Sequence, residues 1–315
     1  MLSFEPITLE KQEFYHKYFY KLPEQSADYT FINLFGLKDI YMLEWAFTDN
    51  LVWIRQKSPY TLIYWAPVGD WFNCDIYEEI KLAKVECEYM IRIPKSLSLL
   101  LKNIPNFKIK ETRDEWEYLY DLNELKTLPG KKFHKKKNLY NQFIKNDFLY
   151  KKIDNSIINH IFDFESKWEI NESNVNEYSS QSNIENDIEA FDNNRLLSNE
   201  VRAEADSVTI KTLLDNFDKI NNIVGGAIYI DNKVVAYTIA DLSMRDTIVV
   251  HSEKGDKNYK GSYQAINRIF LENVENNDNR FKFVNREQDV GDLGLRKAKL
   301  SYNPVGFIEK YSGFC

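Results

Sequence analysis

The sequence predicts an α+β protein of two tandem domains, each a mixed, mostly antiparallel sheet flanked by helices. Its 315 residues exceed the usual size of one domain, about 100–200 residues. Short runs of β-branched and aromatic residues alternate with segments of helical periodicity, which is typical of such a fold. A polar stretch ends in the turn signal Pro129-Gly130. We therefore predict domains at residues 1–126 and 127–315.

The first half shows one clear hairpin. Two apolar runs, Leu51–Gln56 and Tyr60–Ala66, are separated by Lys57-Ser58-Pro59, as in two antiparallel strands joined by a turn. The remaining elements that we expect in this half are one helix and two strands, at Asp75–Lys84, Phe107–Lys110 and Trp116–Leu122.

The second half begins with helices and then changes period. We expect helices at Lys131–Asn146, Ser156–Trp168 and Glu200–Phe217, and a surface loop over the polar stretch Asn171–Ser182. A hairpin follows, because Asp231-Asn232 separates two apolar runs and both residues tolerate the positive φ of a tight turn. The last expected elements alternate strand and helix and end in an extended piece: Thr247–Ser252, Ser262–Asn273, Phe281–Asn285 and Leu293–Leu300.

Composition argues against several classes of protein. Lys plus Arg number 41 against 48 for Asp plus Glu, and the net charge of −7 disfavours a general nucleic-acid coat. The cysteines Cys74, Cys87 and Cys315 are too widely spaced for a disulfide framework or a zinc site. The first residues lack the charged and apolar regions of a signal peptide, and no apolar run approaches the about 20 residues that span a bilayer. We expect a cytoplasmic protein with no metal and no integral membrane contact.

The most informative stretch is a strand, turn and helix from Val249 to Tyr263. A helix start has unpaired N–H groups, so a turn with Gly255 and Gly261 before it can bind a phosphate. The alternative is an ordinary turn that contains two glycines. If this turn is a binding site, the residues that would contact the phosphate-bearing ligand are Lys257, Tyr259, Lys260, Gly261 and Ser262.

His251 and Glu253 end the strand before that turn. Because strand side chains alternate, the two are expected on one face, with Ser252 on the other. Together they could orient an amine or act as general acid and base. The alternative is a structural histidine at a strand end. The catalytic candidates are His251, Glu253 and Tyr263.

Two further segments concentrate charge. The run Lys131–Lys137 places lysines four residues apart, a repulsion of about 0.2–0.5 kcal/mol per pair, which favours a phosphate-bearing partner such as tRNA, a nucleotide or a lipid headgroup. Alternatively, acidic neighbours neutralise it. The segment Asn285–Tyr302 either binds an anion through its arginines and lysines or forms a solvated helix face with internal ion pairs. The candidate anion-binding residues are Lys131, Lys132, His134, Lys135, Lys136, Asn285, Arg286, Glu287, Asp289, Arg296 and Lys299.

These motifs resemble a known family. Gly130–Asn138, His251–Lys254, Tyr259–Tyr263 and above all Asn285–Tyr302 are similar to an uncharacterised bacterial family related to the C-terminal domain of phosphatidylglycerol lysyltransferase. The first half matches more loosely, mainly at Tyr29–Phe35.

The resemblance implies two tandem GCN5-related acyltransferase-like (GNAT-like) domains. It implies donor phosphates at Lys257–Tyr263 and an acyl group where neighbouring strands splay, beside His251 and Glu253. The lysyltransferase relatives carry a lysyl group from aminoacyl-tRNA to a lipid. We thus expect an acyl- or aminoacyltransferase that uses acyl-CoA or aminoacyl-tRNA as donor and an amine or hydroxyl as acceptor. The alternative is a non-catalytic GNAT-like module that binds a nucleotide, RNA or a small amine. The acceptor and the oligomeric state stay open.

Overall fold

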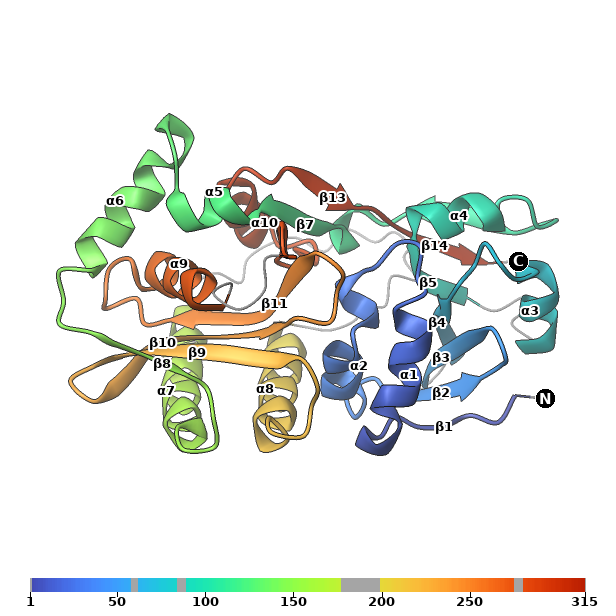
Figure 1. Cartoon of the computed structure of the whole chain (residues 1–315), viewed down its shortest axis with the longest axis horizontal. Helices are drawn as coiled ribbons and strands as arrows, with labels where there is room; N and C mark the ends of the chain where they lie inside the picture. The colour runs from blue at the N-terminus through green and yellow to red at the C-terminus, as the bar shows by residue number, and fades with distance from the viewer. Residues whose placement is uncertain (1, 58–61, 84–88, 177–198, 275–279, 315) are drawn as a thin grey trace.

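The protein folds into two seven-stranded sheets that lie side by side, each with helices packed on it (Figure 1). The computed structural model describes residues 2–57, 62–83, 89–176, 199–274 and 280–314. In order across the first sheet, the strands are β1 (Glu5–Pro6), β2 (Leu43–Phe47), β3 (Leu51–Lys57), β4 (Leu62–Gly69), β5 (Tyr89–Pro94), β14 (Lys310–Phe314) and β6 (Lys108–Glu111). In the second sheet they are β13 (Gly306–Ile308), β7 (Glu117–Asp121), β12 (Phe283–Asn285), β11 (Thr247–Gly255), β10 (Lys233–Asp241), β9 (Ile223–Ile230) and β8 (Leu149–Lys152).

Each sheet contains one parallel pair among antiparallel ones. The pairs are β4 with β5 and β11 with β12, and each is joined through a helix, as a parallel crossover requires. The predicted class, two mixed and mostly antiparallel sheets flanked by helices, is therefore confirmed.

The two sheets exchange strands. The chain passes from β6 in the first sheet directly to β7 in the second, and near its end from β13 in the second sheet back to β14 in the first. β6 pairs with β14 and β7 pairs with β13, so two antiparallel segments tie the sheets together. The predicted boundary after residue 126 stays a prediction; β7 precedes it but belongs to the second sheet, and β14, from the end of the chain, belongs to the first.

Helices cover both faces of the second sheet. Three helices, α5 (Leu122–Thr127), α6 (His134–Phe143) and α9 (Ser262–Val274), lie on one side, and α7 (Ile158–Asn176) and α8 (Asn199–Asp215) lie on the other (Figure 1). The helix α10 (Leu293–Leu300) follows β12. The first sheet carries α1 (Gln12–Phe19), α2 (Phe31–Leu37), α3 (Ile76–Ala83) and α4 (Lys95–Leu101).

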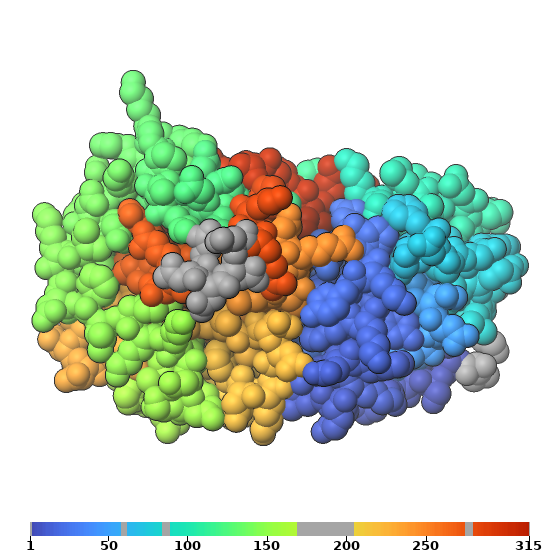
Figure 2. Space-filling model, viewed as in Figure 1, coloured from blue at the N-terminus to red at the C-terminus, as the bar shows by residue number. Residues whose placement is uncertain are grey.

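The two halves share a core. The largest cluster of buried apolar side chains contains Trp45 and Phe31 from the first half together with Leu213 and Tyr237 from the second. Helix α2 packs directly on α8, and in the space-filling view the blue and yellow surfaces meet there (Figure 2). A site between these helices therefore has walls from both halves.

Two local predictions can be compared with the structure. The hairpin turn is confirmed, because Asp231 and Asn232 have φ angles of 50° and 60° between β9 and β10. The loop predicted from Asn171 is wrong over its first part, because α7 continues to Asn176. The rest of that loop lies outside the described residues.

Candidate active site

The parallel strands β11 and β12 pair over a short stretch and then separate. Their last paired residues are Val249 and Asn285; β11 continues to Gly255, whereas β12 ends. A cavity of about 240 Å³ lies where they part. Its walls come from the first half, from α8 and from the two strand ends, including Asn33, Leu37, Tyr41, Arg92, Asp206, Thr209, His251, Glu287 and Val290.

A β-bulge at His251 sets which side chains face this cavity. On β10, the consecutive residues Ile239 and Ala240 pair with Ser252 and Val250, so His251 has no partner of its own in the ladder. The extra residue reverses the alternation beyond it. Ser252 therefore lies on the side of the sheet that α7 covers, and its hydroxyl is 3.3 Å from that of Tyr237, whose ring packs on Phe164 of α7. The next residue, Glu253, points to the opposite side of the sheet.

The expected pairing of His251 with Glu253 is consequently wrong. His251 lines the cavity beside α8, but Glu253 accepts a hydrogen bond of 2.9 Å from Asn267 on α9, the opposite side of the sheet. Glu253 also accepts from Arg286 at 2.7 Å. The sequence could not show this, because one inserted residue in a strand leaves no mark in its composition. Catalytic roles for these residues and for Tyr263 stay predictions.

His251 is held between two carboxylates. Its Nδ1 lies 2.7 Å from Oε1 of Glu287, and its Nε2 lies 3.8 Å from Oδ2 of Asp241, a residue with no solvent exposure. Burial alone would lower the pKa of His251, but the neighbouring carboxylates of Asp241 and Glu287 raise it to about 9. At neutral pH the imidazole is thus a cation. It can donate a proton or a hydrogen bond, and it is poorly suited to accept one.

The cavity contains unsatisfied polar atoms. Among the described residues, Nε2 of His251, Oδ2 of Asp241 and Nε of Arg92 are buried without a hydrogen-bond partner. Buried polar atoms normally have partners, since leaving one unpaired costs about 1–3 kcal/mol. Such atoms beside a cavity are typical of a site that a ligand completes.

Three residues around the cavity have left-handed backbone conformations. Arg92 has φ 59°, Glu287 has φ 54° and Val290 has φ 48°. This region is rare outside glycine and asparagine, above all for a β-branched residue, and costs about 1–3 kcal/mol per position. Strained backbone of this kind gathers at functional sites, and here all three positions line one cavity.

Arg92 is anchored in the first half of the chain. Its guanidinium forms a buried ion pair with Asp28 and lies 4.1 Å from the ring centre of Trp65. Asp28 in turn contacts Lys310 on β14, which donates to Glu117 on β7 at 2.6 Å. The exchanged strands and the cavity wall are therefore linked by one buried charge network.

The predicted donor turn bonds mostly to itself. Four of its N–H groups have acceptors within the chain: Asp256 donates to the carbonyl oxygen of Val235, Asn258 to Oδ1 of Asp256, Tyr259 to the carbonyl oxygen of Asp256, and Ser262 to that of Tyr259. A Cβ on Gly261 would lie 2.2 Å from the carbonyl oxygen of Leu139 on α6, so the helix start is closely covered. Lys257 and Lys260 are exposed beside it. Donor binding by this turn stays a prediction, and these bonds count against it.

The segment from Asn285 to Lys299 forms internal contacts. Asp289 is fully buried and accepts from Arg296 at 2.6 and 2.8 Å, and Arg296 also contacts Asp114. Lys299 donates to the carbonyl oxygens of Arg286 and Gln288, and burial lowers its pKa to about 8. Asn285 donates to Glu117 inside the protein. Of the residues predicted here to bind an anion, Glu287 reaches the cavity.

The basic run lies elsewhere, at the start of α6. Lys131, His134 and Lys135 are exposed, while Lys132 pairs with Glu124 at 2.7 Å. Lys136 lies 4.2 Å from the ring centre of Tyr302, and burial lowers its pKa. These side chains are not in the wall of the cavity, and their anion-binding role stays a prediction.

Sequence reasoning missed several residues of the site. Asp241, Arg92 and the α2 residue Asn33 carry no recognisable motif, and only the fold brings them to His251. Asp241 ends a predicted strand, which is a weak signal that could have been noted.

Comparisons with known proteins establish the family. A family model described as "Phosphatidylglycerol lysyltransferase, C-terminal" matches residues 19–313. The chain belongs to this family. It is similar to a conserved protein of unknown function from Bacteroides thetaiotaomicron, with 27% identity, coverage of 100% of this chain and 99% of that one, and a TM-score of 0.83. L-PGS from Bacillus licheniformis has the same fold, with 15% identity, coverage of 98% and 92%, and a TM-score of 0.64.

One curated relative also matches. An uncharacterized protein from Mycoplasmoides gallisepticum is 25% identical over 194 residues, which are 62% of this chain. The match spans about half of that relative, 54% of its length. In the part of this chain that the structure describes, no helix is both long and apolar enough to cross a membrane, and no group of His, Cys, Asp and Glu could hold a metal ion.

Proposed function

We propose that this protein transfers an aminoacyl group from aminoacyl-tRNA to an amine or hydroxyl acceptor in the cavity between β11 and β12. The observation that carries the proposal is the His251 cation, which lines a cavity walled by both halves of the chain and whose buried Nε2 makes no hydrogen bond. Membership of the lysyltransferase family supports the reaction class.

In this proposal His251 stabilises charge and does not abstract a proton. The acceptor nitrogen or oxygen attacks the ester carbonyl carbon, a bond forms between them, and negative charge develops on the carbonyl oxygen. The Nε2–H of His251 donates to that oxygen. As the intermediate collapses, the ester C–O bond breaks, and the tRNA hydroxyl leaves with the proton that the acceptor loses. One such donor is worth about 10²–10³ in rate.

Glu287 positions the imidazolium through Nδ1. Asp206 also lines the cavity, and its carboxylate pairs with Lys254 at 2.7 Å.

The turn before α9 supports tRNA over coenzyme A as donor. A pyrophosphate held at a helix start needs free backbone N–H groups. Four N–H groups of the turn already donate to acceptors within the chain. A donor that is held by other contacts is therefore favoured.

The test supplies purified protein with charged tRNA or with acyl-CoA, together with amine and hydroxyl acceptors, and detects products by mass spectrometry. We expect transfer from tRNA, and a loss of about 10²–10³ in rate for His251→Gln. Glu78→Gln, on the exposed face of α3, should keep full activity. Transfer from acyl-CoA alone would overturn the choice of donor. Binding of charged tRNA without transfer to any acceptor would favour the non-catalytic module.

A further inference from the structure

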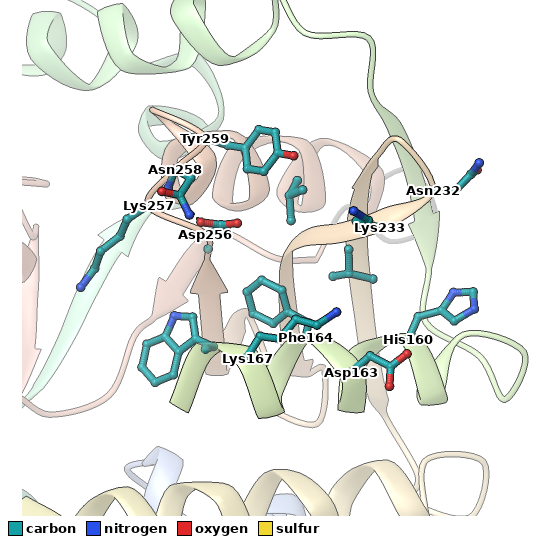
Figure 3. Close-up of a pocket in the computed structure, with 14 residues that line it drawn as sticks. His160, Asp163, Phe164, Lys167, Asn232, Lys233, Asp256, Lys257, Asn258 and Tyr259 are labelled. Carbon is teal, nitrogen blue, oxygen red and sulfur yellow. The ribbon is translucent and has the colours of Figure 1, made fainter. Parts of the chain in front are cut away.

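A second cavity lies on the same side of the second sheet, between α7 and the ends of β10 and β11. Its volume is about 370 Å³. Figure 3 shows Phe164 and Lys167 on α7 at one side of it and the turn Asp256–Tyr259 at the other. Lys233, the first residue of β10, also lines it. None of the candidate catalytic residues lines this cavity, but Lys257 and Tyr259 of the predicted donor turn do, through their side of the turn and not through the start of α9.

The ammonium group of Lys254 contacts residues that line both cavities. Lys254 is buried, and its Nζ lies 2.7 Å from Asp206, which lines the first cavity. The same Nζ lies 4.3 Å from the ring centre of Trp168, which lines the second. Oε2 of Glu165, on α7, also lies 2.7 Å from this Nζ. Lys254, on β11, therefore links a residue in the wall of one cavity to a residue in the wall of the other.

The lining of the second cavity suits a nucleoside phosphate. The partly exposed ring of Trp168 provides an apolar surface on which a base can stack, and the buried side chains of Phe164 and Val235 also contribute to the lining. The exposed lysines Lys167 and Lys233 bring positive charge to its rim in a chain whose net charge is −7. Base stacking beside cationic side chains is how proteins bind unpaired nucleotides.

The rim also offers groups for a base edge or a ribose. Asp163, Asn232 and Asn258 bring carboxylate and amide groups from three different elements to the cavity (Figure 3). A hydroxyl or an exocyclic amine can bond to such groups. Small polar groups around an apolar floor are typical of a ligand site.

We propose that this second cavity binds the terminal nucleoside phosphate of the acyl donor, and that the attached acyl group passes Lys254 into the first cavity. This inference rests on the proposed function for the acyl group, but the nucleotide site can be tested by itself. The donor's nucleotide and its reacting ester would then occupy adjacent cavities on one face of the sheet. Lys254 would act as a positioning residue at the passage between them.

The same chemistry could come from a free nucleotide or from the 3′ end of an RNA. The experiment therefore titrates the full chain with three probes in a calorimeter: adenosine 5′-monophosphate, coenzyme A, and an RNA hairpin with a single-stranded 3′ end. Tighter binding of the hairpin than of the two small molecules would assign the site to an RNA end. Tighter binding of a small molecule would assign it to a free nucleotide.

Two variants locate the binding. Lys167→Glu with Lys233→Glu reverses the charge of the rim at exposed positions, so folding should be unaffected, and we expect binding of the best probe to weaken about tenfold or more. Lys102→Glu, exposed at the end of α4, is the matched control and should bind as the wild type does. Equal weakening by the control, or no binding of any probe, would overturn the proposal.

The binding result is separate from the transfer result. If the probes bind and the rim variant loses them while no acyl transfer is found, the nucleotide site stands and the transferase function fails. If transfer occurs but the rim variant keeps normal binding and normal KM for the donor, the function stands and this site is wrong.

Discussion

Replacing Glu287 by glutamine tests the charge state of His251, on which the proposed chemistry depends. The pKa of His251 is raised from 6.5 to about 9 in the folded protein. At 1.36 kcal/mol per pKa unit, this shift is worth about 3 kcal/mol of folding free energy. Because the folded pKa lies above the unfolded one, this stability is fully present below pH 6.5 and is lost as the pH rises through 9. Linkage places about 1.5 kcal/mol of the loss between pH 6.5 and 8.

A second group, Lys299, limits the pH range in which the stability change can be assigned to His251. Lys299 has its pKa lowered to about 8 by burial, so it costs stability below pH 8 and this cost is relieved as the pH rises further. The two effects oppose each other above pH 8. In the wild type, measurements between pH 6.5 and 8 therefore report mainly on His251. The carboxylate of Glu287 also raises the pKa of Lys299, so in Glu287→Gln it is the NMR titration of the ring that isolates His251.

Urea unfolding at several pH values and NMR titration of the histidine rings are the assays. Glu287→Gln removes one of the two negative charges beside the imidazole, so we expect a lower pKa for His251 and a smaller loss of stability between pH 6.5 and 8. Glu78→Gln should follow the wild type. The reasoning is refuted if His251 of the wild type titrates at or below 6.5, because it would then be neutral at physiological pH.

Two further substitutions test how the halves are joined. Lys310→Met leaves the buried carboxylates of Asp28 and Glu117 without their shared cation, so the free energy of unfolding measured in urea should fall by about 3–5 kcal/mol. The control Lys110→Met changes an exposed lysine and should have little effect. Equal losses for the two variants would contradict the buried network. Gly36→Ala places a Cβ 2.8 Å from Cγ2 of Thr209, forcing α2 away from α8 at a cost of about 1–3 kcal/mol by thermal unfolding. Gly306→Ala, whose Cβ would meet open space, is its control, and an unchanged melting temperature for Gly36→Ala would show that the helices separate freely.

Much of the second domain could be predicted because its signals are local. The Asp231-Asn232 turn and the helices beginning near Lys131 and Ser262 follow from residues adjacent in sequence. In the first half, β2, β5 and helices α1, α2 and α4 were not predicted, because each is only five to eight residues long, shorter than the window in which hydrophobic periodicity distinguishes helix from strand.

The sequence by itself determined the class of the fold, the family and the importance of the segment around His251, because each depends on patterns or motifs written in order along the chain. Only the tertiary structure decided that β7 and β14 exchange sheets and that Asp241 and Arg92 meet at His251. It also decided that a bulge turns Glu253 away from the cavity. These features depend on strand pairing between distant residues, whose register is fixed by packing across the whole protein and by no local preference.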